Sequence, residues 1–171
     1  MCSQEYRLRP VKEEELPILL KWRNSERVRD YLYFDHLITW DEHQAWFRGK
    51  NPRYLRMFEW FGKPAGIVSY SDVDLNNNRS LWGFYLGEEN LPKGTGMKML
   101  TLGLAYAFET LRFHKVIGEV LAFNHPSIRI HHKLGFRLEG IYAQHVWKAG
   151  RFQDVLSFAM LRDDWEKQKE S

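Results

Sequence analysis

The chain has 171 residues, enough for one domain with a substantial core, and 15% of them are aromatic. The formal net charge is +3, with acids and bases interleaved and no long like-charge run, which argues against a nucleic-acid partner. No apolar run is long enough to span a membrane, no signal-peptide core is visible, and the single cysteine, Cys2, cannot form an internal disulfide. We therefore expect a cytoplasmic protein without a membrane partner.

The first half of the chain is predicted to form a strand, several helices and a hairpin. Thr39 and Glu42 have the spacing of a helix capping box, and Ser25 is positioned to cap a short helix. Phe61-Gly62-Lys63-Pro64 supplies a turn. The expected elements are a strand (6–11), helices (13–24, 25–29 and one beginning after Thr39), a hairpin (53–61 with 63–70) and a polar loop (74–79).

The second half alternates strands and helices before a final hairpin, which predicts an α/β protein with parallel strands at the centre of a mixed sheet. Residues from Asp163 onward are strongly charged and are expected to fray. The expected elements are strands (80–86 and 115–122), helices (96–111 and 127–134) and a hairpin (137–148 with 151–161).

Two glycines, Gly94 and Gly96, stand at the predicted start of the 96–111 helix. Helix N-termini bind phosphates through free amides and the positive end of the dipole, so the amides of Thr95, Gly96 and Met97 are candidate donors, and Lys93 adds charge. A plain helix start after a turn is the alternative interpretation.

A second motif follows the next strand: Asn124, Ser127, His131 and the pair Gly135-Phe136. Together the two strand–loop–helix segments resemble the acyl-CoA-binding core of the Gcn5-related N-acetyltransferases (GNAT). The resemblance implies one domain over 1–171 with the α/β GNAT fold: a mixed sheet of about seven strands, splayed central parallel strands, and helices on both faces. One departure is Leu91, where the family usually has Gln or Arg.

The resemblance also implies acetyl-CoA as co-substrate and no metal. Backbone groups around Phe84, Tyr85 and Leu86 would bind the pantetheine arm, as would Asn124. The remaining implied coenzyme contacts are Ser127 and Lys133. His131 occupies the place of the family's tyrosine acid and could protonate the departing thiolate, or could simply pack on its helix.

A charged residue inside a central strand is costly unless it faces a cavity, which makes Glu119 the candidate general base for the attacking amine. The alternative is a solvent-facing glutamate.

The acceptor site is expected from the N-terminal helices, where Arg23 could hold a diphosphate bidentately. Aromatic and imidazole side chains could line it, although each could equally be a core residue. The candidates are Tyr33, His43, Trp46, Phe47 and Trp82.

Within the family, the chain is most similar to acetyltransferases that modify the 4-amino group of a UDP-linked amino-deoxysugar in pseudaminic acid synthesis, which would serve flagellin or surface glycosylation. The resemblance is carried by 22–24, 82–90, 92–96 and 118–124. Alternatives are a GNAT acting on a polyamine or protein N-terminal amine, and a non-catalytic acetyl-CoA-binding module. Exposed aromatics would also allow a homodimer.

Overall fold

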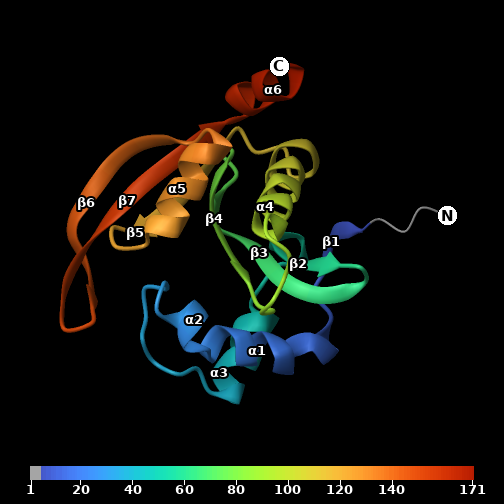
Figure 1. Cartoon of the computed structure of the whole chain (residues 1–171), viewed down its shortest axis with the longest axis vertical. Helices are drawn as coiled ribbons and strands as arrows, with labels where there is room; N and C mark the ends of the chain where they lie inside the picture. Colours follow the sequence, from blue (N-terminus) through green and yellow to red (C-terminus); the bar gives the residue numbers. More distant parts are fainter. Residues whose placement is uncertain (1–4) are drawn as a thin grey trace. The chain divides into compact units, whose positions relative to one another are not determined.

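The computed structural model describes residues 5–171, so Cys2 lies outside the described part. Seven strands form one sheet in the order β1-β2-β3-β4-β5-β7-β6. The pairs β1–β2, β2–β3, β5–β7 and β6–β7 are antiparallel, whereas β4 and β5 are parallel, which confirms the predicted mixed α/β sheet (Figure 1). The strands are β1 (Tyr6–Pro10), β2 (Leu55–Trp60), β3 (Lys63–Asp74), β4 (Arg79–Leu86), β5 (Lys115–Leu121), β6 (Arg137–Lys148) and β7 (Arg151–Leu161).

Residues 5–171 also form six α-helices and three short helical turns. The helices are α1 (Leu16–Asn24), α2 (Glu26–Arg29), α3 (Trp40–Arg48), α4 (Thr95–Ala105), α5 (His125–Leu134) and α6 (Arg162–Glu170), and the turns are η1 (Glu13–Glu15), η2 (Pro52–Tyr54) and the π-helical η3 (Tyr106–Thr110). The chain forms two compact units, one from the residues up to Ser69 with Phe84–Gly103, the other from Tyr70–Gly83 with Leu104–Ser171. The single domain stays a prediction.

Helices cover both faces of the sheet in the first unit. Leu19 and Trp22 of α1 are buried with Met57 of β2 and Ile67 of β3 in one cluster. Gly66, the neighbour of Ile67, faces the opposite side, where an added Cβ would lie 2.9 Å from the Met99 sulfur of α4. The sandwich of α1, sheet and α4 therefore holds the end of β4 between two helices.

Local signals explain where α2 and α3 begin. The predicted capping box is confirmed: the Glu42 amide donates to Thr39 Oγ1 at 3.3 Å, and Glu42 Oε2 accepts from the Thr39 amide at 2.7 Å. Ser25 occupies the N-cap position of α2, as predicted, and its carbonyl accepts from the amides of Val28 and Arg29. Its hydroxyl makes no cap bond to α2 and donates instead to the Trp22 carbonyl at 2.7 Å, so Ser25 also ends α1.

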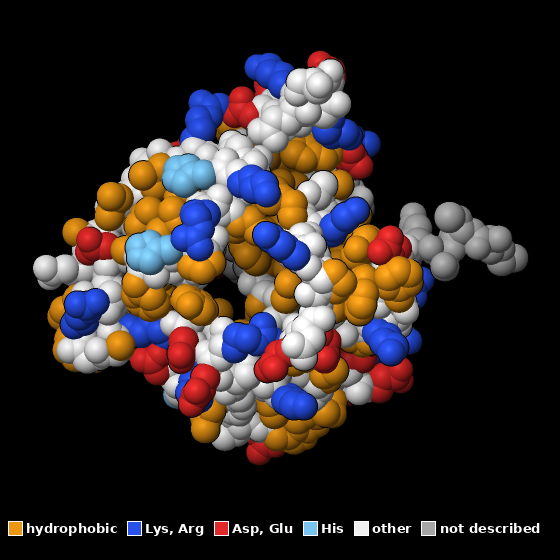
Figure 2. Space-filling model, viewed as in Figure 1, with side chains coloured by type: hydrophobic (Ala, Val, Ile, Leu, Met, Phe, Trp, Pro, Cys, Tyr) orange, Lys and Arg blue, Asp and Glu red, His pale blue; other side chains and the backbone are white. Residues whose placement is uncertain are grey.

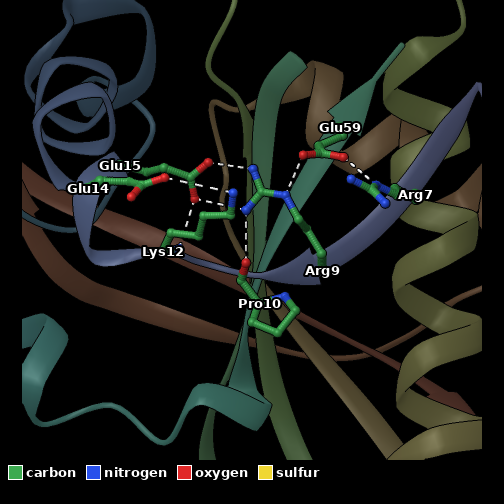
Figure 3. Close-up of polar contacts among 7 residues, drawn as sticks. All are labelled: Arg7, Arg9, Pro10, Lys12, Glu14, Glu15 and Glu59. Atoms are coloured by element: carbon green, nitrogen blue, oxygen red, sulfur yellow. Dashed lines mark hydrogen bonds and ion pairs between the residues drawn. The ribbon is translucent and has the colours of Figure 1, made fainter. Parts of the chain in front are cut away.

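A buried ion network ties β1, β2 and the turn before α1 together (Figure 3). Glu59 is 4% exposed, and its two carboxylate oxygens accept from Arg7 and Arg9. Arg9 also donates to Glu15, whose carboxylate accepts from the Lys12 amide at 2.8 Å. Burial alone would raise the pKa of Glu59, but the two arginines lower it overall, so the carboxylate stays charged and paired.

In the second unit the parallel ladder between β4 and β5 is short. It covers three residue pairs and ends at Leu81 and Ile117, although β5 continues to Leu121 and pairs with β7 along its whole length. The predicted separation of the two central strands thus begins immediately after Leu81. Helix α5 packs on the face of β5 toward which a Cβ on Gly118 would point, because that Cβ would meet His131 of α5.

The C-terminal segment was expected to fray, and that prediction is wrong. Residues Arg162–Glu170 form α6, whose Trp165 is buried and packs on Phe108 with ring centroids 5.4 Å apart. The single aromatic in a charged stretch supplies the burial that anchors the helix.

On the face shown in Figure 2, several Lys and Arg side chains lie across the middle of the view, and most Asp and Glu side chains lie below them or at the edges. Among residues 5–171, no helix is long and apolar enough to span a membrane. In the same range, no three or more His, Cys, Asp or Glu side chains are grouped so that they could hold a metal ion.

Candidate active site

The segment that leaves β4 is fixed against α1 and β3 in the first unit. A Cβ on Gly87 would lie 1.9 Å from Trp22 Cδ2, so only glycine allows the indole to pack there. The amides of Gly87 and Glu88 both donate to the Ala65 carbonyl, at 2.8 and 3.2 Å, and Trp22 Nε1 donates to Glu88 Oε1 at 3.2 Å. The backbone that precedes the predicted phosphate loop is therefore held on two sides.

Arg27 holds the same segment from α2. Its guanidinium donates to the carbonyls of Leu86 at 3.0 Å and Gly87 at 2.5 Å. No local signal identifies its partners, because they lie about sixty residues away in the chain.

The predicted phosphate loop contains a left-handed glycine just before α4. Gly94 has φ +93°, a conformation that favours glycine. The Thr95 amide donates to the Pro92 carbonyl at 3.1 Å, as does its hydroxyl at 2.7 Å, so this amide is already engaged. The amides of Gly96 and Met97 lie in the first turn of α4, where the helix offers no carbonyl partner.

The fold itself gives no steric reason for glycine at position 96. An added Cβ would meet only Leu86 Cδ1, at an ordinary 3.5 Å, and Gly96 does not have a positive φ. A glycine beside open helix amides instead leaves room for a ligand to approach the backbone. Lys93 is exposed next to this turn, so the residues present fit a phosphate-bearing coenzyme.

Arg23 is a half-buried cation at the end of α1. Its Nη1 is buried and has no hydrogen-bond partner among the described residues. Burial lowers the pKa of its guanidinium; Tyr85 opposes that shift, and Arg29 reinforces it. Burial lowers the pKa of His43, and the charge of Arg23 adds to that shift. The groups that act on this cation thus include no carboxylate, and a buried guanidinium without an anion is costly.

Tyr85 stands beside Arg23 on β4. Its ring packs against the buried α1 cluster, and burial raises the pKa of its phenol, so the hydroxyl is neutral at pH 7. The sequence predicted Tyr85 as a backbone contact for the coenzyme. The structure adds a side chain that faces α1, next to the predicted acceptor residue.

Most of the aromatic and imidazole side chains that were predicted to line the acceptor site are packed inside the protein. His43 is buried and its Nε2 donates to the Leu16 carbonyl at 3.0 Å, joining α3 to α1, while Phe47 packs on the α1 cluster. Trp46 is 38% exposed and stacks on His43 with centroids 5.4 Å apart. Tyr33 is half-buried in the segment after α2. Of this set, Trp46 and Tyr33 have exposed surface with which to meet a ligand.

Asn24 was not predicted, yet it organises the segment that joins α2 to α3. Its side chain donates to the Ile38 carbonyl and accepts from the Ile38 amide, both at 2.9 Å. These two hydrogen bonds fix the backbone at Ile38. The same segment carries Phe34 and Leu37, which are 65% and 61% exposed. Three successive residues of α1 therefore have different roles. Trp22 packs in the buried cluster, Arg23 is a half-buried cation, and Asn24 fixes the backbone of Ile38.

In the second unit, His131 lies in a closed environment. It is 1% exposed, and its ring stacks on Phe158 with centroids 5.2 Å apart. Nδ1 lies 2.8 Å from the Ser127 carbonyl, which can only accept, so Nδ1 carries the proton and Nε2 accepts from Trp82 Nε1 at 3.2 Å. Burial lowers the pKa of His131 to about 4, so the ring is neutral at pH 7.

This environment does not favour the proton-donor role predicted for His131, because a neutral imidazole with both nitrogens engaged has no acidic proton to give. Trp82, predicted to bind substrate, is 6% exposed and is the partner of His131. Both side chains are thus part of the packing between β4, β5 and α5.

The two predicted catalytic side chains, Glu119 and His131, lie on opposite sides of β5. His131 packs over Gly118, and because successive residues of a strand face opposite sides, Glu119 faces away from α5. Glu119 is half-buried and opposite Ser157 of β7. The structure therefore does not bring the predicted base and the predicted acid together.

The start of α5 has the predicted polar groups. Asn124 caps the helix, its Oδ1 accepting from the Ser127 amide at 3.2 Å, which leaves its side-chain NH₂ to donate to a ligand. Ser127 is half-buried, with its hydroxyl 3.4 Å from His131 Nδ1, and Lys133 is exposed.

Comparison with known proteins supports the family resemblance. The model of the acetyltransferase (GNAT) domain family matches residues 6–137. The SPbeta prophage-derived uncharacterized N-acetyltransferase YokL of Bacillus subtilis is 35% identical over 104 residues, which cover 60% of this chain and 58% of that protein. The uncharacterized N-acetyltransferase p20 of Bacillus licheniformis is 27% identical over 173 residues, covering 96% and 97%.

The fold is also that of solved acetyltransferases. The crystal structure of spermidine N-acetyltransferase from Vibrio cholerae in complex with CoA and spermine has a TM-score of 0.87 at 19% identity, covering 96% of this chain and 99% of that one. At this identity the likeness concerns the fold.

We predict a specific loss of stability on acidification through His131. Its pKa is lower in the folded protein, about 4, than the roughly 6.5 of an unfolded imidazole, so its contribution is complete above pH 6.5 and is lost as the pH falls toward 4. Between pH 7 and 4.5, urea unfolding should show the wild type losing on the order of 2 kcal/mol more than His131→Leu.

The control for a general loss of packing is Trp165→Phe, which changes a buried ring that does not titrate and should keep the wild-type dependence on pH. Equal losses in the wild type and His131→Leu would contradict a neutral, buried His131.

Proposed function

The chain belongs to the acetyltransferase (GNAT) domain family and is an acetyl-CoA-dependent N-acetyltransferase, and we propose that its acceptor is an amine on an anionic molecule, the 4-amino group of a UDP-linked amino-deoxysugar. The observation that supports this acceptor is Arg23, a cation with a buried, unpartnered Nη1 among residues that offer it no carboxylate. A diphosphate would supply the missing anion in a geometry that guanidinium groups bind bidentately.

For the coenzyme, we assign the amides of Gly96 and Met97, with Lys93, to the pyrophosphate. The backbone of Phe84–Leu86 and the Asn124 amide are assigned to the pantetheine arm, with Ser127 and Lys133 at the start and end of the same helix. The support is the family resemblance together with the open first turn of α4 and the side-chain NH₂ of Asn124. When bound, acetyl-CoA supplies the thioester carbonyl that the amine attacks.

The chemistry requires the acceptor ammonium to lose a proton before it attacks. We propose Glu119 as the general base, acting directly or through a water. The leaving group is a thiolate whose parent thiol has a pKa of about 8.5, by analogy with cysteine, so it can depart without an obligatory protein acid. This accounts for turnover without a proton from His131, and positioning of the two substrates supplies much of the rate.

The pathway is inferred from the sequence resemblance rather than from Arg23: synthesis of a pseudaminic acid precursor for flagellin or another surface glycan. A nucleotide sugar combines the two groups that this acceptor site needs, a diphosphate for the cation and a flat base for exposed aromatic surface such as Trp46. A homodimer stays a prediction.

A polyamine is the second candidate acceptor. It is favoured by the likeness of the fold to the Vibrio cholerae spermidine N-acetyltransferase. A polycation, however, would meet the uncompensated charge of Arg23, with Arg27 and Arg29 on the next helix, and like charges in a partly buried site repel each other.

The proposal is tested by measuring release of free CoA from acetyl-CoA with UDP- and dTDP-linked 4-amino-deoxysugars, spermidine and an N-terminal peptide. We expect turnover with the UDP-linked sugar and none with spermidine. Turnover with spermidine or peptide would overturn the acceptor while keeping the enzyme class, and binding of acetyl-CoA without turnover would favour a coenzyme-binding module.

The role of Arg23 is tested by measuring KM values for the Arg23→Gln variant in the same assay. Loss of a charge-assisted hydrogen bond should raise the KM for the UDP-linked sugar by about 10- to 100-fold and leave the KM for acetyl-CoA unchanged. Lys21→Gln, at an exposed position of the same helix, is the control and should change neither. An unaltered acceptor KM in a folded Arg23→Gln protein would remove Arg23 from the site.

We predict that Glu119→Gln lowers kcat by about 10²- to 10⁴-fold, the usual range for loss of a general base. The affinity for acetyl-CoA, measured by calorimetry, should stay close to that of the wild type. The control is Glu139→Gln, which removes an exposed glutamate paired with Lys115. Wild-type turnover in Glu119→Gln would exclude this base.

A further inference from the structure

The β4–β5 ladder ends at the point where an indole and an imidazole meet. Its last pair is Leu81 with Ile117, so continued parallel pairing would next place Trp82 opposite Gly118. Trp82 instead donates through Nε1 to His131 of α5, and the two rings are edge to face at 85° with centroids 5.8 Å apart.

Gly118 fits beneath this pair because it has no side chain. An added Cβ would lie 2.4 Å from His131 Nε2 and 2.9 Å from Trp82 Nε1, the two atoms of the hydrogen bond. Contacts this short do not occur, so the imidazole, the indole and the Gly118 backbone occupy one fully packed position.

Further aromatic rings enclose the pair. Phe136 stacks on Trp82 with centroids 5.2 Å apart and packs edge-on against His131 at 4.9 Å. On its other nitrogen, His131 is fixed by the Ser127 carbonyl one turn earlier in α5. The position of the indole is therefore determined by α5, the helix that begins with Asn124.

We propose that Trp82 and His131 form a wedge over Gly118 that sets where β4 leaves β5, making both side chains positioning residues for acetyl-CoA. The inference rests on the proposed coenzyme role of Phe84–Leu86, the residues that follow Trp82 and Gly83 in β4. Backbone groups of adjacent strands otherwise pair when they can, so the separation needs a side-chain cause.

The first test is Trp82→Phe, which keeps an aromatic ring but leaves His131 Nε2 without its donor. Calorimetry with acetyl-CoA, which needs no acceptor, should show an increase in Kd of about tenfold. Trp165→Phe, a buried tryptophan of α6 that packs on Phe108, is the control for a purely structural loss and should keep the wild-type Kd.

A double-mutant cycle separates the hydrogen bond from packing. His131→Leu alone should weaken acetyl-CoA binding as Trp82→Phe does, and the double variant should be no weaker than either single variant, because no buried polar partner is then left unsatisfied. Additive effects of the two substitutions, or single variants with the wild-type Kd, would overturn the wedge. A wild type that does not bind acetyl-CoA would instead overturn the proposed function.

One readout needs no variant. In the wild-type protein, the indole N–H of Trp82 should exchange with solvent at least 100-fold more slowly than that of Trp147, which is 62% exposed. Comparable exchange at the two tryptophans would show that the Trp82–His131 bond is absent, even if the substituted proteins do not fold.

Discussion

The arrangement of the proposed active site depends on two parallel strands that pair only at their start. β4 and β5 share a ladder that ends at Leu81 and Ile117, and the next pair of positions is taken over by the Trp82–His131 contact above Gly118. A hydrogen bond between two buried side chains is strong evidence of a fixed geometry, because either group alone would be costly to bury. We propose that this contact sets where β4 leaves β5.

A second constraint acts in the other unit, where the chain buries a cation without burying its partner. Glu59 shows the usual solution, with its charge paired by Arg7 and Arg9. Arg23 departs from it, since its Nη1 has no partner among the described residues. The chain thus pairs the buried charge of Glu59 internally, whereas Arg23 Nη1 has no internal partner, and this contrast is the physical basis of the proposed anionic acceptor.

Much of the fold could be predicted because its signals are local. The hairpin of β6 and β7 and the Thr39–Glu42 capping box follow from alternation, turn residues and spacing. Helix α6 could not be found this way, because its stability comes from Trp165 packing on a distant Phe108. The site divides similarly: Gly94 and Asn124 carry local signals, whereas the environment of His131 and the Arg27 contacts with Leu86 and Gly87 depend on tertiary packing.

We propose that this chain binds acetyl-CoA along the end of β4 and at the start of α4, and a crystal structure of the complex with CoA would decide the matter. In that structure we expect the pyrophosphate on the amides of Gly96 and Met97 and the pantetheine arm along the backbone of Phe84–Leu86, with the Trp82–His131 hydrogen bond intact. A pyrophosphate bound away from the first turn of α4, or β4 paired with β5 beyond Leu81, would contradict it.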